Sequence, residues 1–191
     1  MNDNLYLWLD LETTGLEPDA SIVEVAAILT RFNGTGFDEL GRYHGVCKLT
    51  GALYDQIGAF VRGMHLKSGL LAEMTISGMT LADHDVDLAK MLRDRLVESD
   101  AGHVHLAGSG VSHFDLAHVK RLMPCTAAWL HWRPLDVGQL EEWRKLQGLP
   151  TFDEANPDQA ARKTHRAMDD IAYHVDEAQW YLASGRYERE Q

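Results

Sequence analysis

Apolar and polar positions alternate in short segments through the first fifty residues of the chain. Alternation from 5 to 10 is typical of a β-strand with two distinct faces. A nearly continuous apolar run from 22 to 29 predicts a strand that is buried inside a sheet. A glycine-containing turn at 33–36 leads into a third predicted strand at 40–49. We expect these three strands to form an antiparallel meander.

The rest of the chain combines helical periodicity with two short apolar segments. This order predicts an α/β fold, in which helices carry the chain to two further strands of the same sheet. A polar loop is expected at 151–158. The predicted elements are short glycine-broken helices within 52–75, a helix capped by Thr80 that continues through Leu96, a strand at 103–107, a helix from Ser112 or His113 to before Pro124, a strand at 135–137, a helix through Leu140, Trp143 and Leu146, and a last helix from near Thr164.

No repeat, low-complexity segment or linker divides the 191 residues, so one domain is expected over 1–185, followed by a charged tail at 186–191. Apolar residues make up 45% and charged residues 25%, the usual balance of a soluble globular protein. No signal peptide or membrane-spanning run is recognisable. Cys47 and Cys125 lack metal-ligand spacing, so we expect two reduced packing thiols and a cytoplasmic protein.

The net charge of −11 speaks against a long nucleic-acid duplex as partner, because phosphate binding favours a basic face. Bound cations can neutralise acids locally, however, and a short oligonucleotide needs only a small positive pocket. The charge therefore favours short nucleic acids over long ones.

Two acids stand at the end of the first predicted strand. Asp10 and Glu12 are two residues apart and project to the same face. Neighbouring carboxylates raise each other's pKa unless a cation lies between them, and hard divalent cations prefer carboxylate oxygens. The alternative is a pair of ordinary solvated acids at a strand end.

Three further polar residues stand at the starts of predicted helices. Asp115 follows a glycine-rich loop, where an acid is also favoured by the helix dipole. His165 and Asp170 lie near the start of the last helix, either as a base and a ligand or as a capped helix N-terminus with an ordinary surface histidine. Asp169 and Asp170 cannot both face one site, because successive helical residues point about 100° apart.

Taken together, these segments resemble the motifs of a known superfamily. Residues 10–15 (Asp-Leu-Glu-Thr-Thr-Gly) resemble the first motif of the DEDD exonucleases, and 113–115 (His-Phe-Asp) the second. Residues 165–170 (His-Arg-Ala-Met-Asp-Asp) resemble the third motif in the histidine-bearing DEDDh branch. The resemblance implies an RNase H-like sheet of three antiparallel and then two parallel strands, and a single exonuclease domain. It implies that Asp10, Glu12, Asp115 and Asp170 hold two divalent cations, Mg²⁺ or Mn²⁺, with His165 as the base. Asp169 is then expected to face solvent or a partner at the helix end.

Within this superfamily the chain is most similar to oligoribonuclease. Residues 61–70 resemble its segment with a histidine before Ser-Gly-Leu, and 131–137 (His-Trp-Arg-Pro-Leu-Asp-Val) resemble its His-Tyr-Arg-Tyr-Leu-Asp-Val. The resemblance implies a homodimer that degrades short RNA to nucleoside 5′-monophosphates. It also implies substrate contacts, namely Leu16 as a wedge against the bases, His65 and Arg133 at the terminal phosphate, Arg133 from the partner subunit, and Trp132 as a stacking aromatic. A surface helix histidine and a solvated arginine are the alternatives for His65 and Arg133.

The second motif departs from oligoribonuclease. Gly110 and Val111 replace an asparagine and a serine, so only part of the phosphate cap is present unless Ser109 or Ser112 substitutes. The His-Phe-Asp form is closer to proofreading and RNase T-like relatives. A general 3′-to-5′ exonuclease that trims longer single-stranded DNA or RNA is therefore the alternative function. A non-enzymatic nucleic-acid-binding module is a third hypothesis, which predicts a missing ligand.

Overall fold

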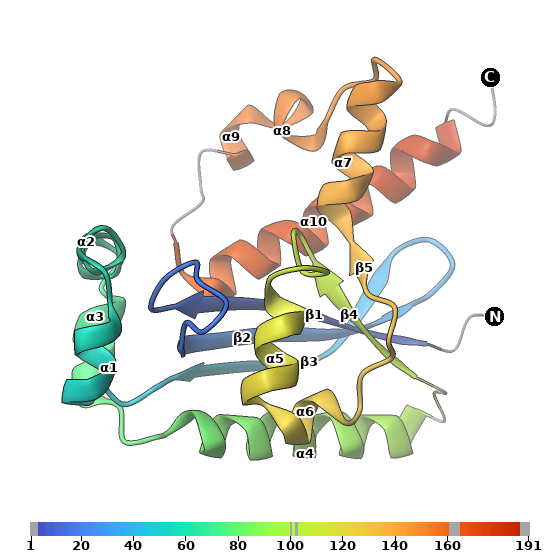
Figure 1. Ribbon diagram of the computed structural model, residues 1–191. Helices are drawn as coiled ribbons and strands as arrows, with labels where there is room; N and C mark the ends of the chain where they lie inside the picture. The colour runs from blue at the N-terminus through green and yellow to red at the C-terminus, as the bar shows by residue number, and fades with distance from the viewer. Residues whose placement is uncertain (1–3, 100, 102, 161–164, 188–191) are drawn as a thin grey trace.

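A five-stranded mixed sheet forms the centre of the protein (Figure 1). The computed structural model describes residues 4–99, 101, 103–160 and 165–187. The strands follow the order β3-β2-β1-β4-β5 across the sheet. They are β1 (Leu5–Thr13), β2 (Ile22–Phe32), β3 (Phe37–Val46), β4 (Val104–Gly108) and β5 (Leu135–Asp136).

The first three strands pair antiparallel, and β4 and β5 add parallel to β1. This arrangement confirms the predicted sheet of three antiparallel and two parallel strands. The apolar run at 22–29 does lie inside the sheet as β2, between β1 and β3. β1 extends to Thr13, so Asp10 and Glu12 lie within its last four residues.

Helices cover both faces of the sheet. Leu5, Leu7 and Leu9 of β1 pack with residues of α4 and α5 on one face, whereas Trp8 packs with residues of α10 on the other (Figure 1). Burying both faces of the central strand anchors it, and with it the two acids near its end. The helices are α1 (Gly51–Gln56), α2 (Ala59–Lys67), α3 (Leu70–Ile76), α4 (Leu81–Ser99), α5 (Asp115–Leu122), α6 (Pro124–Ala127), α7 (Val137–Leu146), α8 (Phe152–Ala155), α9 (Pro157–Ala160) and α10 (Ala167–Tyr187).

Several local predictions were wrong. The expected polar loop at 151–158 contains α8 and α9, and α8 begins with a capping box in which Thr151 and Glu154 bond reciprocally. The last helix begins at Ala167, and the predicted start near Thr164 lies outside the described residues. α10 continues past Gly185 to Tyr187, while the rest of the expected tail, 188–191, also lies outside them.

Neither cysteine is bonded to the other. Cys47 is buried, as expected of a packing thiol, but Cys125 is exposed. None of the helices in the described part of the chain is both long enough and apolar enough to cross a membrane.

Candidate active site

Three carboxylates from two elements meet at one end of the sheet. Asp10 and Glu12 project from the same face of β1, and Asp170 comes from the first turn of α10, which packs on that face. One carboxylate oxygen from each residue lies within 4.8 Å of the other two. Asp169, one position earlier in α10, is exposed. The structure therefore selects Asp170, not its neighbour, for this cluster.

The cluster is electrostatically strained. Burial, and then the charges of Asp115 and Asp170, raise the pKa of Asp10 well above its usual range. Burial, followed by Glu24 and Asp170, raises the pKa of Glu12 to about 8. Such a set of crowded oxygen donors fits a hard divalent cation, which stabilises the ionised form of each acid. The donor set thus suits Mg²⁺ or Mn²⁺.

Asp115 lies beside this cluster, although it is not among the three residues whose oxygens approach most closely. It is the first residue of α5 and is buried. Burial raises the pKa of its carboxyl group to about 7, and hydrogen bonding with the backbone of Asp115 itself and of Leu11 on β1 opposes this shift. Its charge in turn raises the pKa of both Asp10 and Glu12. Asp115 therefore shares one electrostatic environment with the three clustered acids.

The sequence predicts His165 at the start of the last helix, but the residue lies two positions before α10, which begins at Ala167. Its backbone has a φ of 55°, and its side chain is exposed. The next residue, Arg166, forms ion pairs with Glu24 on β2 and Glu73 on α3. Sequence reasoning missed Glu24, although an acid inside the apolar run of a buried strand was a usable signal.

His65 is not a surface residue, so that alternative is wrong. The imidazole is fully buried on α2, and Nε2 donates a 2.9 Å hydrogen bond to the carbonyl of Thr13. Nδ1 lies 3.8 Å from Glu12 Oε2 and has no hydrogen-bond partner within the described residues. Burial lowers the pKa of this imidazole. The ring therefore lies against Glu12, one of the three clustered acids.

The other expected substrate contacts are exposed. Leu16, in the turn after β1, is 84% exposed. Trp132 is also exposed, and the guanidinium of Arg133 lies over its ring at 4.6 Å from the centroid. Both belong to the segment between α6 and β5, which in Figure 1 lies on the far side of α5 from the start of α10. The structure thus does not bring Trp132 and Arg133 together with the acids of the same chain.

Asp136 holds the loop that leads to Asp115. Its carboxylate accepts hydrogen bonds from the Gly110 and Ser112 backbone N–H groups, at 3.0 and 3.1 Å, and from the Ser112 hydroxyl at 2.5 Å. It also caps α7 through the Gly138 N–H. The Ser112 hydroxyl, one of the two candidate replacements in the incomplete phosphate cap, is therefore engaged within the protein.

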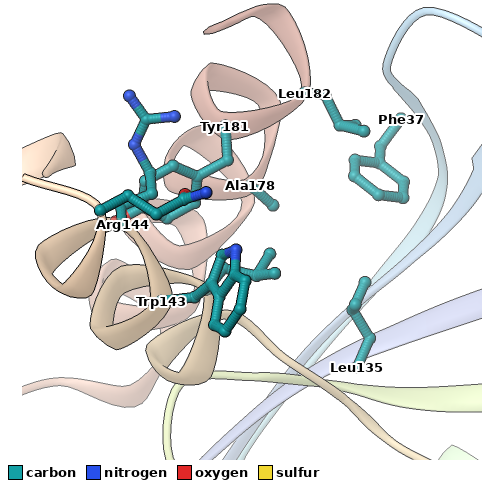
Figure 2. Close-up of a pocket in the computed structure, with 9 residues that line it drawn as sticks. Phe37, Leu135, Trp143, Arg144, Ala178, Tyr181 and Leu182 are labelled. Carbon is teal, nitrogen blue, oxygen red and sulfur yellow. The ribbon is translucent and has the colours of Figure 1, made fainter. Parts of the chain in front are cut away.

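A separate cavity of about 420 Å³ lies between α7 and α10 (Figure 2). Trp143, Leu135, Phe37 and Leu182 form much of its apolar wall, and none of the clustered acids lines it. Trp143 is 61% exposed and Leu146, further along α7, is 82% exposed. Trp143 and Leu146 therefore form an apolar surface on the side of α7 that no other element covers within the described residues.

The sheet, its helices and the clustered carboxylates define a 3′-to-5′ exonuclease of the DEDDh class with an RNase H-like fold. No family model matches the chain. An oligoribonuclease of Nocardia farcinica is 30% identical over 186 residues, which cover 95% of this chain and 81% of the relative. One of Corynebacterium diphtheriae is 34% identical over 186 residues, covering 94% and 82%. The chain belongs to the oligoribonuclease family.

Solved structures of exonuclease I share the fold. The enzyme of Methylocaldum szegediense superposes with a TM-score of 0.66 at 16% identity over 95% of this chain. E. coli exonuclease I in complex with a dT13 oligonucleotide gives 0.65 at 17% identity over 93% of this chain. In both cases this chain spans 40% of the exonuclease I chain, so the likeness concerns the fold alone.

Proposed function

We propose that this protein is a metal-dependent 3′-to-5′ exoribonuclease that degrades short RNA oligonucleotides to nucleoside 5′-monophosphates. The observation that carries the proposal is the cluster of Asp10, Glu12 and Asp170, whose oxygens converge within 4.8 Å. Membership of the oligoribonuclease family supports short RNA as the substrate. The net charge of −11 agrees with a short rather than a long partner.

Asp10, Glu12, Asp115 and Asp170 are the proposed ligands of two divalent cations, Mg²⁺ or Mn²⁺. When bound, these cations supply Lewis-acid chemistry for phosphodiester hydrolysis. The raised pKa of Asp10, Glu12 and Asp115 supports this role, because each acid becomes a better ligand once a cation favours its ionised form. The rigid β1 strand fixes the first two acids, while α5 and α10 bring the other two.

His165 is the proposed general base. Its exposed imidazole lies two residues before α10 and five before Asp170, where it can accept the proton of an attacking water. Histidine is the side chain that most often serves as general base in enzymes. The water attacks phosphorus, the bond to the 3′-oxygen breaks, and the released mononucleotide retains the 5′-phosphate.

Four residues are proposed to contact the substrate. Leu16 is exposed beside the first motif and can insert between bases, and Trp132 offers an open aromatic face for stacking. His65 and Arg133 are assigned to the terminal phosphate, and His65 would donate to it through Nδ1 when that nitrogen carries a proton. The segment between α6 and β5, which carries Arg133, lies apart from the start of α10, and this supports a role of Arg133 in the site of a partner subunit (Figure 1).

A homodimer is therefore part of the proposal. The uncovered apolar side of α7, with Trp143 and Leu146, supports it, because large exposed apolar patches mark interaction surfaces. Self-association through this helix would remove both side chains from water. We also propose a cytoplasmic location, which the two free thiols of Cys47 and Cys125 support.

A digestion of 5′-labelled substrates tests the function. The panel contains a dinucleotide RNA, a longer single-stranded RNA, and single- and double-stranded DNA, each with Mg²⁺ or Mn²⁺ and with a chelator control. We expect fast, chelator-sensitive loss of the dinucleotide, with longer strands nearly untouched. Stepwise shortening of the long strands would instead support the trimming exonuclease that the His-Phe-Asp motif suggests. Absence of cleavage on every substrate would reject both.

A further inference from the structure

A fully buried acid, Glu24, lies beside the candidate active site and belongs to none of the proposed ligands. It is the register partner of Glu12, directly across the β1–β2 pair. Two acids facing each other on neighbouring strands repel, so a buried pair of this kind requires strong compensation. Glu24 receives that compensation from residues around His165.

Three groups hydrogen-bond to the Glu24 carboxylate. Arg166 donates through Nη2 at 2.9 Å and Nε at 3.1 Å, both to Oε1, and His44 Nε2 donates at 2.7 Å. The backbone N–H of Ala167 donates to Oε2 at 3.3 Å. Burial by itself raises the pKa of Glu24, but these hydrogen bonds outweigh burial and lower it below the usual value. Glu24 is therefore a buried ionised carboxylate at neutral pH.

These bonds fix the segment that carries His165. Arg166 and Ala167 follow it directly, and the carbonyl of Arg166 begins the hydrogen bonding of α10 by accepting from the Asp170 N–H at 3.1 Å. His165 itself has a φ of 55°, a left-handed conformation that is uncommon for residues other than glycine. Such a conformation persists when the neighbouring structure holds it in place. Glu73 of α3 adds a second ion pair to Arg166, at 2.5 Å.

We propose that Glu24 is a positioning residue, which holds His165 in its catalytic orientation by clamping Arg166 and the first N–H of α10. It acts through the chain segment and touches neither substrate nor cation. The inference rests on the proposed role of His165 as the base. It assigns a role in positioning His165 to a residue of β2 that precedes it by 141 positions in the sequence.

A double-mutant cycle tests the proposal, with kcat measured for wild type, Glu24→Gln, His165→Ala and the double variant. Glutamine keeps the shape of the glutamate side chain, but its NH₂ group is a donor and cannot accept the hydrogen bonds that Arg166 and the Ala167 N–H donate. We expect Glu24→Gln to lower kcat by about 10²-fold, the scale of a misplaced catalytic group, with little change in KM. In the His165→Ala background the same change should cost less than about threefold, because groups acting as one unit are non-additive.

Two measurements separate positioning from other roles. Mn²⁺ affinity, measured by calorimetry without substrate, should change by less than about threefold in Glu24→Gln, whereas a purely electrostatic role would weaken it in proportion to kcat. Glu39→Gln is the matched control, because Glu39 also receives the fork of an arginine, Arg42, but on the exposed side of β3. It should behave as wild type. If circular dichroism shows that Glu24→Gln does not fold, Arg166→Lys, which keeps the charge and loses the fork, enters the same cycle.

Equal losses in the wild-type and His165→Ala backgrounds would overturn the inference, as would an unchanged kcat or a loss explained by Mn²⁺ affinity. Wild-type cleavage and its loss in His165→Ala are measured first. A wild-type protein that cleaves nothing rejects the proposed function and this inference with it. Additive losses in an active enzyme reject the inference alone.

Discussion

His65 approaches Glu12 from α2, with Nδ1 3.8 Å from the carboxylate oxygen Oε2, and both side chains are buried. The carbonyl of Thr13 can only accept, so the hydrogen on the ring belongs to Nε2 and the neutral ring presents a lone pair at Nδ1. His65 therefore joins the end of β1 to the helical segment at 51–76. The ring can support Glu12 by filling the space beside it, whereas a hydrogen bond from Nδ1 to a phosphate oxygen requires a proton on Nδ1 as well, because that oxygen only accepts.

A single substitution separates these two roles. We expect His65→Ala to lower stability by about 2–4 kcal/mol, since it empties a fully buried position. If Nδ1 also contacts the terminal phosphate, the variant loses activity mainly on a dinucleotide that carries a 5′-phosphate. Comparing kcat/KM for the dinucleotide with and without that phosphate checks this. Equal losses on both substrates would leave only the supporting role.

The clustered acids predict an unusual pH dependence of stability. Folding raises the pKa of Glu12 to about 8 and that of Asp115 to about 7. At pH values between the ordinary pKa of each acid and its raised pKa, the folded state therefore binds more protons than the unfolded chain. Stability of the cation-free protein should therefore fall as pH rises from about 5 to 8. The raised pKa of His44 acts in the same direction. Thermal melts in chelator should show the midpoint dropping by several degrees, at about 2–4 °C per kcal/mol.

Cations should reverse this loss. Mn²⁺ binds the ionised acids, so its stabilising effect on the melting midpoint should be larger at pH 8 than at pH 5. Glu12→Gln removes one of the titrating groups and should flatten the slope measured in chelator. A midpoint that rises with pH in the cation-free wild type would contradict the electrostatic description of the cluster.

Asp170 and Asp169 form a matched pair of neighbours. We expect Asp170→Ala to lower kcat by at least about 10³-fold, because it removes one of three converging carboxylates. Asp169→Ala should stay within about threefold of wild type, since Asp169 is exposed. Cation-dependent melting shifts should shrink in the first variant alone. Full activity in Asp170→Ala would refute its role as a ligand.

Leu16 can be altered without disturbing the core. Its side chain is 84% exposed, so Leu16→Ala should leave the melting midpoint unchanged. If Leu16 packs against the bases, KM for the dinucleotide should rise about tenfold, the equivalent of about 1.4 kcal/mol of lost binding. Val97→Ala, at a similarly exposed aliphatic residue on α4, is the control. Equal KM values in all three proteins would remove Leu16 from the substrate contacts.

The uncovered side of α7 gives a test of the homodimer. Trp143→Ala should shift the protein toward monomer, as measured by light scattering. Truncating a large aromatic residue that acts as a hot spot of an interface commonly costs about 2 kcal/mol of binding free energy or more. Phe60→Ala, at an aromatic that is also highly exposed but on α2, serves as the control. Loss of dinucleotide cleavage together with the dimer would support the contribution of Arg133 from a partner. A wild-type protein that is monomeric at all concentrations would reject the homodimer.

Local spacing in the sequence was sufficient for much of the fold and for the strand-borne acids. Alternation along 5–10 and the apolar run at 22–29 report the period of a strand directly, so β1, β2 and the side shared by Asp10 and Glu12 followed from them. Helix ends were less predictable. The missed helix α8 depended on the capping pair of Thr151 and Glu154, which lies within an otherwise polar stretch.

The sequence by itself determined the sheet class and, through its three motifs, the residues expected to converge. Only the tertiary structure decided that His65 is buried and that Arg166 pairs with Glu24 across 142 residues. The reason is physical. Periodicity records which side of an element each residue occupies, whereas the partner of a buried charge depends on where distant elements pack, and no local pattern encodes that distance.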